Sequence, residues 1–532
     1  MNSLSRRKEL FLAAVIAVFC AYDLIATIIS IWDFTTDDAY ISWVYARQLV
    51  NGNGLHWHVD LPRVEGYSNF LWIIIAAFVI KCKLPLITTI KFISCFSLGA
   101  GLFFLYRIGR LFFSPLLSML PIFIFSHFLG VAWWTVSGME SMFYCALSLL
   151  LIWQCAVALG YHPVEENNPA AGIHKVSTRA WALTSVALLL LCLTRFEGAI
   201  WGIPVLLFVC CHLKQHGVRT VFAESRTIYI WGAVFFICFL LPYAVYFIWR
   251  LDYFGHWIPN SYRCKALKPG QIFTVDLDYL RVIFPLLIAA LPYFLSVKDC
   301  RHWLLWSPSV LYALLLWEAN PVIAHFLRLF LGPFALFTLL PVLGVIVFLG
   351  YFKQHKMDPK LLATGGIILL TVLFIPGNES LYLQALLKQY QERTQIRLAV
   401  AKIINTQAAK GSTVLFGDCG IVPFKVSLRK DIRFIDSDCL NNAELTQAPY
   451  NNDLNLYAEH IAAQVKPEWV ITTYEPLLLQ GNYPFEMLKR KHFFDQYQLI
   501  ITLESGWIYK LSSKKSAREI DYVYKVYKRR EQ

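Results

Sequence analysis

Thr36-Asp37-Asp38-Ala39-Tyr40-Ile41 directly follows the first long apolar run of the chain, which begins near Glu9. That run is long enough to cross a bilayer core as a helix, which takes about 20 residues. The two adjacent carboxylates are therefore expected at a membrane edge, where ionisable groups are costly and usually functional. We interpret this segment as the polar rim of an active site lying on a membrane. The alternative is an ordinary loop with interfacial aromatic residues.

The composition of the whole chain is that of a polytopic membrane protein. Of its 532 residues, 57% are hydrophobic and 16% are aromatic, which excludes an ordinary soluble domain. The net charge is +13, but the basic residues form small clusters between apolar runs. Such clusters set the orientation of membrane proteins, so we expect a lipid bilayer and no nucleic acid as partner. None of the 13 cysteines has C-x-x-C spacing, so the sequence does not support a zinc or redox site of that spacing. We also expect no organic cofactor.

Eleven apolar runs are predicted to span the membrane. They begin near Glu9, Leu86, Pro115, Gly138, Ala180, Ala199, Ile228, Val282, Trp303, Leu329 and Leu361. The run 69–80 is shorter than the roughly 17 residues that a span needs, so it is predicted to be an interfacial or re-entrant helix. With Arg6 to Lys8 in the cytoplasm, the basic connectors all lie inside, as the positive-inside rule requires. The predicted fold is a multi-spanning helical protein with its N-terminus inside and its C-terminus outside.

The composition changes near Gly377, where polar residues begin to dominate. We predict a membrane domain over 1–376, with its first outer loop at 33–85, and a soluble α/β domain over 377–532. Strands are expected at 412–416, 432–435, 470–473 and 499–502, with a hairpin turn at Gly506-Trp507. Cys419 and Cys439 could form a disulfide on the outer side or remain free thiols.

Three further groups of polar residues are candidates for substrate binding. The segment 252–265 contains Asn260, Tyr262, Arg263 and Lys265, which could hold a phosphate through charge and hydrogen bonds. His325 and Arg328 share one helix face and could hold another phosphate oxygen. The remaining candidates are Arg47, Arg63, Glu65, Tyr67, Asn69, Glu140, Arg195 and Glu197. The alternatives are interfacial aromatic and basic belts, charges at headgroup level, and simple pairing of Arg195 with Glu197.

Five motifs resemble those of bacterial GT-C membrane glycosyltransferases in the same order. They are Asp37-Asp38-Ala-Tyr-Ile with Arg63-Val-Glu65-Gly-Tyr67-Ser-Asn69, Ser137-Gly-Met-Glu140, Thr194-Arg195-Phe-Glu197-Gly, Tyr253-Phe-Gly-x-x-x-Pro259-Asn260-Ser-Tyr262-x-x-Lys265, and Phe416-Gly-Asp418-x-Gly420-x-x-Pro423. The terminal arabinofuranosyltransferase branch is the most similar. One departure is Phe196, where the family usually has proline.

The resemblance implies an enzyme of the bacterial inner membrane that uses a polyprenyl-phosphate-linked sugar on the periplasmic side. The sugar would be a pentofuranose such as arabinofuranose, or a related sugar, and the acceptor a cell-surface glycan or glycolipid. Asp37 would be the catalytic acid/base residue, with Asp38 as the second candidate, and Lys265 and its neighbours would hold the lipid phosphate.

The residue chemistry is compatible with such a transfer. A phosphate leaves readily, so the reaction needs a carboxylate to deprotonate the acceptor hydroxyl and cations to stabilise the phosphate. Arg47 or Arg63 could keep the carboxylate ionised. Alternatively, Asp37 and Asp38 could hold a divalent cation. Two other classes stay open: a transporter or translocator of lipid-linked saccharides, and a scaffold without chemistry.

Overall fold

The computed structural model describes residues 5–163, 176–222, 225–266, 272–296, 300–319, 321–351, 358–377, 381–476, 480–481, 492–506, 508–510, 515–517 and 522–530. The chain divides into two compact units. The first, here called the helical unit, comprises Met1–Trp32, Lys91–Trp249 and Gly270–Glu379. The second, the sheet unit, comprises Asp33–Ile90, Arg250–Pro269 and Ser380–Gln532. The sheet unit therefore combines three segments that are far apart in the sequence. The predicted domains, 1–376 and 377–532, were instead separated by one boundary.

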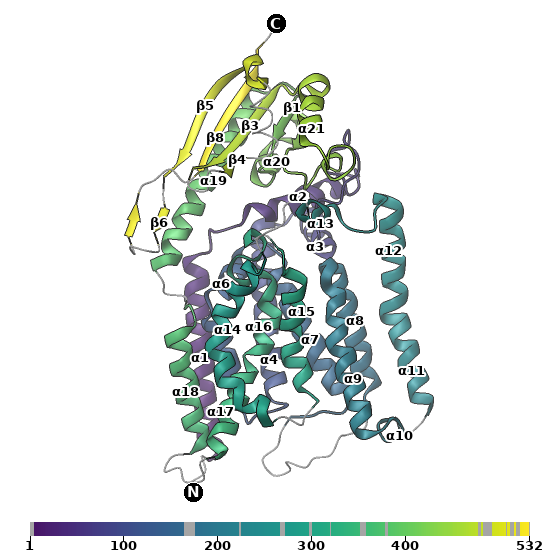
Figure 1. Ribbon diagram of the computed structural model, residues 1–532, viewed down its shortest axis with the longest axis vertical. Coiled ribbons are helices and arrows are strands. Elements are labelled where there is room, and N and C mark those ends of the chain that lie inside the picture. Colours follow the sequence, from purple (N-terminus) through teal and green to yellow (C-terminus); the bar gives the residue numbers. More distant parts are fainter. Residues whose placement is uncertain are drawn as a thin grey trace. The chain divides into compact units, whose positions relative to one another are not determined.

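Apolar helices make up the helical unit (Figure 1). They are α1 (Arg6–Ser30), α4 (Leu86–Gly109), α5 (Met119–His127), α6 (Leu129–Val136), α7 (Ser141–Ala158), α8 (Thr178–Thr194), η1 (Phe196–Trp201), α9 (Gly202–His216), α10 (Val218–Val221), α11 (Ser225–Phe235), η2 (Phe236–Leu240), α12 (Leu241–Phe254), α14 (Thr274–Ser296), α15 (His302–Leu316), η3 (Pro321–Phe330), α16 (Leu331–Phe337), α17 (Leu339–Tyr351) and α18 (Pro359–Phe374). The first residues of α4 and the last of α12 belong to the sheet unit.

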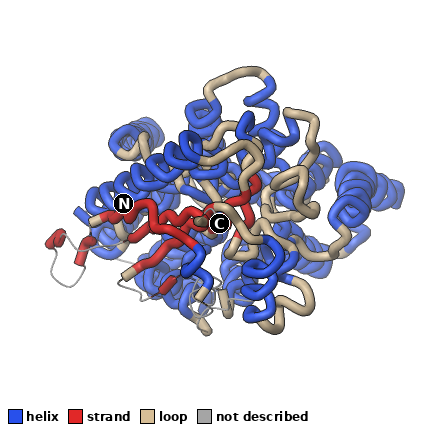
Figure 2. Tube along the Cα trace, turned by 90° about the horizontal axis from the view of Figure 1, so that it is seen from above, coloured by secondary structure: helices blue, strands red, loops and turns tan. Residues whose placement is uncertain are grey.

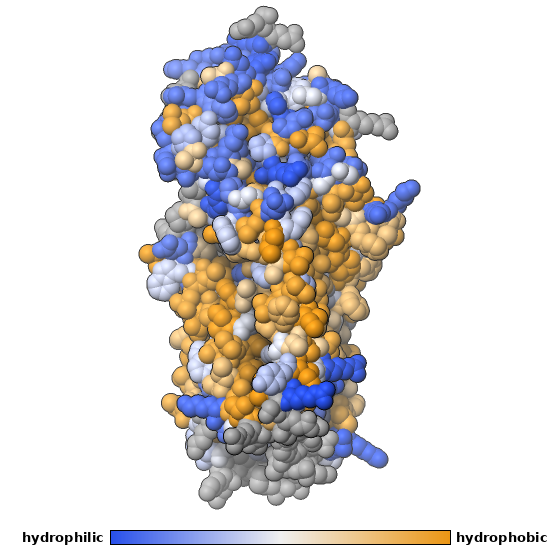
Figure 3. All heavy atoms as spheres, turned by 90° about the vertical axis from the view of Figure 1, so that its right-hand side faces the viewer, coloured by the Kyte–Doolittle hydropathy of each residue, from blue (hydrophilic) through white to orange (hydrophobic). Residues whose placement is uncertain are grey.

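Among the described residues, seven helices are long and apolar enough to cross a membrane, or eight if the bent pair α5 and α6 forms one span. Three further predicted spans correspond to shorter apolar helices, α8, α15 and α18. Large apolar side chains are exposed along these helices, for example Phe11, Phe96 and Leu295. On the face shown in Figure 3, hydrophobic residues cover most of the region that the helices form. Such a surface is stable only in contact with lipid, so the chain is a polytopic helical membrane protein.

About half of the segment predicted as the first outer loop is helical. It contains α2 (Asp37–Val50) and α3 (Phe70–Lys81). Asp37 and Asp38 occupy the first turn of α2, where negative side chains interact favourably with the helix dipole. The short helix predicted at 69–80 is confirmed as the 12-residue α3.

The C-terminal part of the sheet unit contains a six-stranded mixed sheet (Figures 1 and 2). Its strands are β1 (Thr413–Phe416), β2 (Arg433–Asp436), β3 (Trp469–Glu475), β4 (Gln480–Gly481), β5 (Tyr497–Ser505) and β8 (Tyr522–Arg529). The order is β2-β1-β3-β8-β5, with β4 paired to β3. Strands β2 and β3 run parallel to β1, and β8 runs antiparallel to β3 and β5. The helices of this part are α19 (Leu381–Gln407), α20 (Ile421–Lys425) and α21 (Leu454–His460).

The four predicted strands are confirmed as β1, β2, β3 and β5, but the predicted hairpin at Gly506-Trp507 is wrong. Strand β5 pairs with β8, and β6 (Ile508–Lys510) pairs with β7 (Lys515–Ala517) in a separate two-stranded sheet. Trp507 itself lies outside the described residues. The sequence analysis also missed α19 and β8, because α19 is polar and β8 lies close to the end of the chain.

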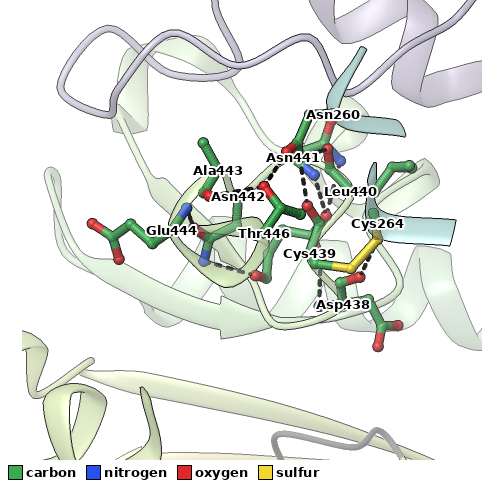
Figure 4. Close-up of a disulfide and its surroundings, with 11 residues drawn as sticks. Asn260, Cys264, Asp438, Cys439, Leu440, Asn441, Asn442, Ala443, Glu444 and Thr446 are labelled. Carbon is green, nitrogen blue, oxygen red and sulfur yellow. Dashed lines mark hydrogen bonds between the residues drawn. A yellow bond between two sulfur atoms is a disulfide. The ribbon is translucent and has the colours of Figure 1, made fainter. Parts of the chain in front are cut away.

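A disulfide joins Cys264 of α13 (Asn260–Ala266) to Cys439 in the loop after β2 (Figure 4). The alternative pairing of Cys439 with Cys419 is therefore wrong. Cys419 is a buried free thiol that donates a hydrogen bond to the carbonyl oxygen of Phe416 at 3.2 Å. Cysteine spacing alone could not choose between these partners, because the fold brings a residue from position 264 next to the loop.

Candidate functional site

Asp37 lies in a cluster of polar side chains from four separate elements of the sheet unit. Its Oδ1 accepts a hydrogen bond from the backbone N–H of Ile421 at 2.8 Å and lies 3.3 Å from Nε of Arg397, on α19. Arg397 Nε also donates to Oδ2 of Asp418 at 2.8 Å. The hydroxyl of Tyr524, on β8, donates to the same Asp418 oxygen. We call Asp37, Arg397, Asp418 and Tyr524 the Asp37 clamp.

The Asp37 clamp lies at the carboxyl end of β1. The chain leaves β1 through α20 to β2 on one side and later returns to β3 on the other. Open α/β sheets bind ligands at such a reversal, just outside the carboxyl ends of the strands. Here the protein's own Asp37 fills that position. A Cβ atom on Gly420 would lie 2.2 Å from Asp37 Oδ2 and 2.3 Å from the Asp37 carbonyl oxygen, so only glycine permits this approach.

The two carboxyl groups of the Asp37 clamp have opposite pKa shifts. Burial and the negative charge of Asp418 raise the pKa of Asp37 well above its usual value, although Arg397 opposes the shift. Burial also acts to raise the pKa of Asp418, but the charge of Arg397 and the hydrogen bonds from Asp37, Arg397 and Tyr524 outweigh it and lower this pKa. Asp418 therefore releases its proton at a lower pH than Asp37 does. Ionised Asp418 then neutralises Arg397, as buried charges require.

Asp38 differs from Asp37 because its side chain is exposed. The idea that these two residues hold a divalent cation does not fit the geometry, because the Asp37 oxygens face the Arg397 guanidinium and the Ile421 N–H. A cation would be repelled there. The described residues contain no group of three or more His, Cys, Asp or Glu side chains that could hold a metal ion. We therefore derive no reaction step through a metal at Asp37.

The cation beside Asp37 is Arg397, and not Arg47 or Arg63 as the sequence analysis expected. Arg47 donates to the carbonyl oxygens of Phe424 at 2.7 Å and Pro423 at 3.2 Å, at the end of α20. Burial lowers the pKa of Arg47 to about 10. Arg63 lies over the ring of Tyr253, with its guanidinium carbon 4.5 Å from the ring centre. Substrate binding by Arg47 and Arg63 stays a prediction.

Glu65 forms a buried ion pair with Arg250, which the sequence analysis did not select. Glu65 Oε1 accepts from Arg250 Nε at 3.0 Å, and Glu65 Oε2 lies 2.6 Å from Arg250 Nη2. Arg250 also donates to the carbonyl oxygens of His256 and Trp257. Burial raises the pKa of Glu65 despite the opposing charge of Arg250. This pair ties the segment around Glu65 to the loop after α12.

Tyr67 and Asn69, two other candidates for substrate binding, are buried beside α2. The ring of Tyr67 packs against that of Tyr45 with 4.9 Å between the ring centres. The side-chain oxygen of Asn69 accepts a hydrogen bond from Ser42 at 3.1 Å. These contacts give both residues a packing role, and substrate binding by them stays a prediction.

Four of the predicted phosphate-binding residues, Asn260, Tyr262, Arg263 and Lys265, lie on α13, which is attached to the loop after β2 (Figure 4). The side-chain amide of Asn260 donates to the carbonyl oxygens of Cys439 at 2.8 Å and Leu440 at 2.9 Å. Arg263 donates to the carbonyl oxygen of Thr446. Lys265 lies with its Nζ 5.9 Å from the ring centre of Tyr262. Asn260 and Arg263 thus hold the loop after β2, and phosphate binding by Tyr262 and Lys265 stays a prediction.

Four predicted site residues meet inside the helical unit. Arg195 forms ion pairs with both Glu140 and Glu197, which confirms the simple pairing of Arg195 with Glu197. Arg328 lies 3.3 Å from the same Glu140 oxygen and donates to Ser141 at 3.3 Å. Two positive and two negative charges therefore balance in a buried cluster. The side chain of His325 lies outside the described residues.

Comparisons with known proteins identify the fold. Residues 385–527 match a domain family of unknown function, DUF8728, and no curated protein sequence matches the chain. The oligosaccharyltransferase of Archaeoglobus fulgidus in its apo form is similar in structure, with a TM-score of 0.53 and 11% identity over 95% of this chain and 80% of that chain.

The structure of that archaeal enzyme, AglB, with an inhibitory peptide and a dolichol-phosphate has a TM-score of 0.51 at 11% identity, over 95% of this chain and 80% of that chain. ArnT from Cupriavidus metallidurans, bound to undecaprenyl phosphate, has a TM-score of 0.50 at 11% identity, over 96% of this chain and 97% of that chain. At these identities the likeness concerns the fold alone, and the chain has the fold of the GT-C membrane enzymes.

Proposed function

We propose that this protein is a membrane glycosyltransferase that takes its sugar from a polyprenyl-phosphate carrier. One observation carries the proposal: in a chain with the GT-C fold, the acidic pair Asp37-Asp38 is held at the first turn of α2 by the Asp37 clamp. Two of the structurally similar proteins contain dolichol-phosphate or undecaprenyl phosphate, which supports a lipid-phosphate donor here as well.

The proposed reaction moves a sugar from a phosphate oxygen to an acceptor hydroxyl. The bond between the anomeric carbon and the phosphate oxygen breaks, and its electron pair stays on the phosphate. The acceptor oxygen forms a new bond to the anomeric carbon, and its proton passes to one carboxylate of the Asp37-Asp38 pair. Lys265 is the candidate cation for the phosphate, because a nearby ammonium stabilises the charge as it develops.

The finer assignment is also a proposal. The donor sugar is a pentofuranose of the arabinofuranose type or a related sugar, and the acceptor is a periplasmic or cell-surface glycan or glycolipid. The resemblance of the motifs to the terminal arabinofuranosyltransferase branch supports this choice. We propose a location in the bacterial inner membrane with the sheet unit on the periplasmic side. The Cys264–Cys439 disulfide supports that side, because disulfides persist in oxidising compartments.

The test uses purified protein in lipid vesicles with synthetic polyprenyl-phosphate arabinofuranose and an arabinan oligosaccharide acceptor. We expect transfer by the wild type and loss of transfer in the Asp37→Asn/Asp38→Asn double variant. The matched control is Asp278→Asn, which removes an acid from an exposed ion pair with Arg281 and should leave transfer unchanged. Full activity in the double variant would refute the proposed site.

A second measurement addresses the sugar. Mass analysis of surface glycans from a strain without this protein should reveal chains that lack one terminal pentose. Loss of a hexose instead would keep the reaction class and overturn the choice of sugar.

A further inference from the structure

We propose that Asp38 is the catalytic base and that Asp37 is a positioning residue, fixed by Arg397, Asp418 and Tyr524 of the C-terminal domain. This inference rests on the proposed function and divides the roles of its acidic pair. The alternative, suggested by the motif resemblance, gives the base role to Asp37.

Oδ1 of Asp37 is already engaged within the protein. Its Oδ1 faces the Ile421 N–H at 2.8 Å and Arg397 Nε at 3.3 Å. Its Oδ2 lies against Gly420, where even one added carbon atom would not fit. A general base must reach the proton that it removes, directly or through one water molecule. An acceptor hydroxyl at Oδ1 of Asp37 would have to compete with Arg397 and the Ile421 N–H for that oxygen.

Asp38 is placed differently by the same helix. Successive residues of an α-helix point about 100° apart around the axis, so Asp38 cannot face the clamp when Asp37 does. Its side chain is exposed, and it lies in the first helical turn, where the helix dipole favours a negative charge. A hydroxyl from solvent can therefore approach Asp38 without disturbing the Asp37 clamp.

The Asp37 clamp fixes the first turn of α2 and thereby the position of Asp38. The exposed fractions of the Asp37, Arg397 and Asp418 side chains are 12%, 8% and 15%, so solvent does not weaken their interactions strongly. Tyr40 of α2 adds an edge-to-face contact with Phe424 of α20, with 5.4 Å between the ring centres. Because catalytic rates depend on ångström-level placement, loosening this turn should slow the reaction without removing any reacting group.

The first part of the test compares the two acids in the vesicle assay. We expect Asp38→Asn to lower kcat by about 100-fold or more, the size of a lost general base. Asp37→Asn should lower kcat much less, because the amide keeps the size of the carboxyl group and can still donate a hydrogen bond to Asp418. The reverse order, a large loss for Asp37→Asn and a small loss for Asp38→Asn, would overturn the assignment.

The second part tests the positioning residues. Arg397→Gln and Tyr524→Phe should lower kcat by about 10-fold while the donor KM stays within about twofold, and Arg397→Lys should recover part of the loss. The controls are Arg393→Gln, one turn earlier on α19 and 3.9 Å from Glu475, and Tyr527→Phe on the same strand as Tyr524. Equal losses in the controls, or no recovery with lysine, would refute positioning.

A third measurement does not depend on activity. Amide hydrogen exchange at the start of α2 should become faster in Arg397→Gln than in Arg393→Gln, since only the former loosens the clamp. If the wild type transfers no sugar, the proposed function and the base assignment both fail, while hydrogen exchange still decides whether the clamp holds α2. Unchanged exchange in Arg397→Gln would refute the clamp by itself.

Discussion

Removal of both carboxylates beside Arg397 should cost more stability than the two single changes together. In the wild type, Arg397 is 2.8 Å from Asp418 and 3.3 Å from Asp37. In Asp418→Asn, Asp37 can lose its proton and neutralise Arg397. In Asp37→Asn, Asp418 remains as the partner. Only the double variant leaves the guanidinium buried beside two neutral amides.

The expected sizes follow from these contacts. Asp37→Asn exchanges one hydrogen-bond donor for another and should cost about 1 kcal/mol. Asp418→Asn loses charge-assisted hydrogen bonds from Arg397 and Tyr524 and should cost about 2 kcal/mol. A buried charge without its partner costs about 3–5 kcal/mol, so we expect about 4–5 kcal/mol for the double variant. The coupling between the two sites is then about 1–2 kcal/mol.

The assay is thermal unfolding of the detergent-purified protein, followed by tryptophan fluorescence. The decrease in Tm for the double variant should exceed the sum of the two single decreases. Asp278→Asn is the control, because the Asp278–Arg281 pair is exposed and such pairs contribute below about 1 kcal/mol. Additive decreases in Tm would show that Arg397 does not depend on these two acids, and the argument that either acid can neutralise it would be wrong.

Three other predictions concern the same unit. The pKa of Asp37 is higher in the folded protein than in the unfolded chain. The Tm of the wild type should therefore fall as the pH rises from about 4 through the raised pKa. The Tm of Asp37→Asn should not show this fall, and an identical dependence of Tm on pH in both proteins would contradict the raised pKa. Arg250→Met should lower the free energy of unfolding by about 3–5 kcal/mol, because it leaves Glu65 buried without its cation. The Glu65→Leu/Arg250→Met double variant should have a higher Tm than Arg250→Met. A lower Tm in the double variant would count against the ion pair. Breaking the Cys264–Cys439 disulfide, which closes a loop of 175 residues, should lower the free energy of unfolding by up to about 5 kcal/mol. Cys264→Ser should abolish the difference in gel mobility between oxidised and reduced protein, whereas Cys419→Ser should keep that difference.

The membrane helices and the parallel strands could be predicted because each signal is local. Long apolar runs predict spans, and short β-branched runs between turn residues predict strands. The same reasoning placed Asp37 and Asp38 directly after the first apolar helix. The polar helix α19 was not predicted, because a charged helix without an apolar stripe has no clear periodic signal.

The partners of the site residues could not be predicted from spacing. Arg47 and Arg63 are near Asp37 in the sequence, yet the contact is made by Arg397, 360 residues further along the chain. Arg250 and Cys264 likewise pair with residues far away in sequence. A sequence identifies unusual charged residues near apolar runs, but the pairs depend on how the three segments of the sheet unit fold together.

The composition of the Asp37 clamp bears on what the C-terminal domain does. Arg397, Asp418 and Tyr524 all lie within 385–527, the range of the family of unknown function. At the carboxyl edge of its sheet, where a comparable domain would bind a ligand, they hold an acid from α2. The loop after β2 is similarly joined to α13 by a disulfide and by Asn260. A fragment limited to 385–527 would lose both attachments. The domain therefore holds both preceding segments, and Asp37 occupies the sheet edge at which other open α/β sheets bind ligands.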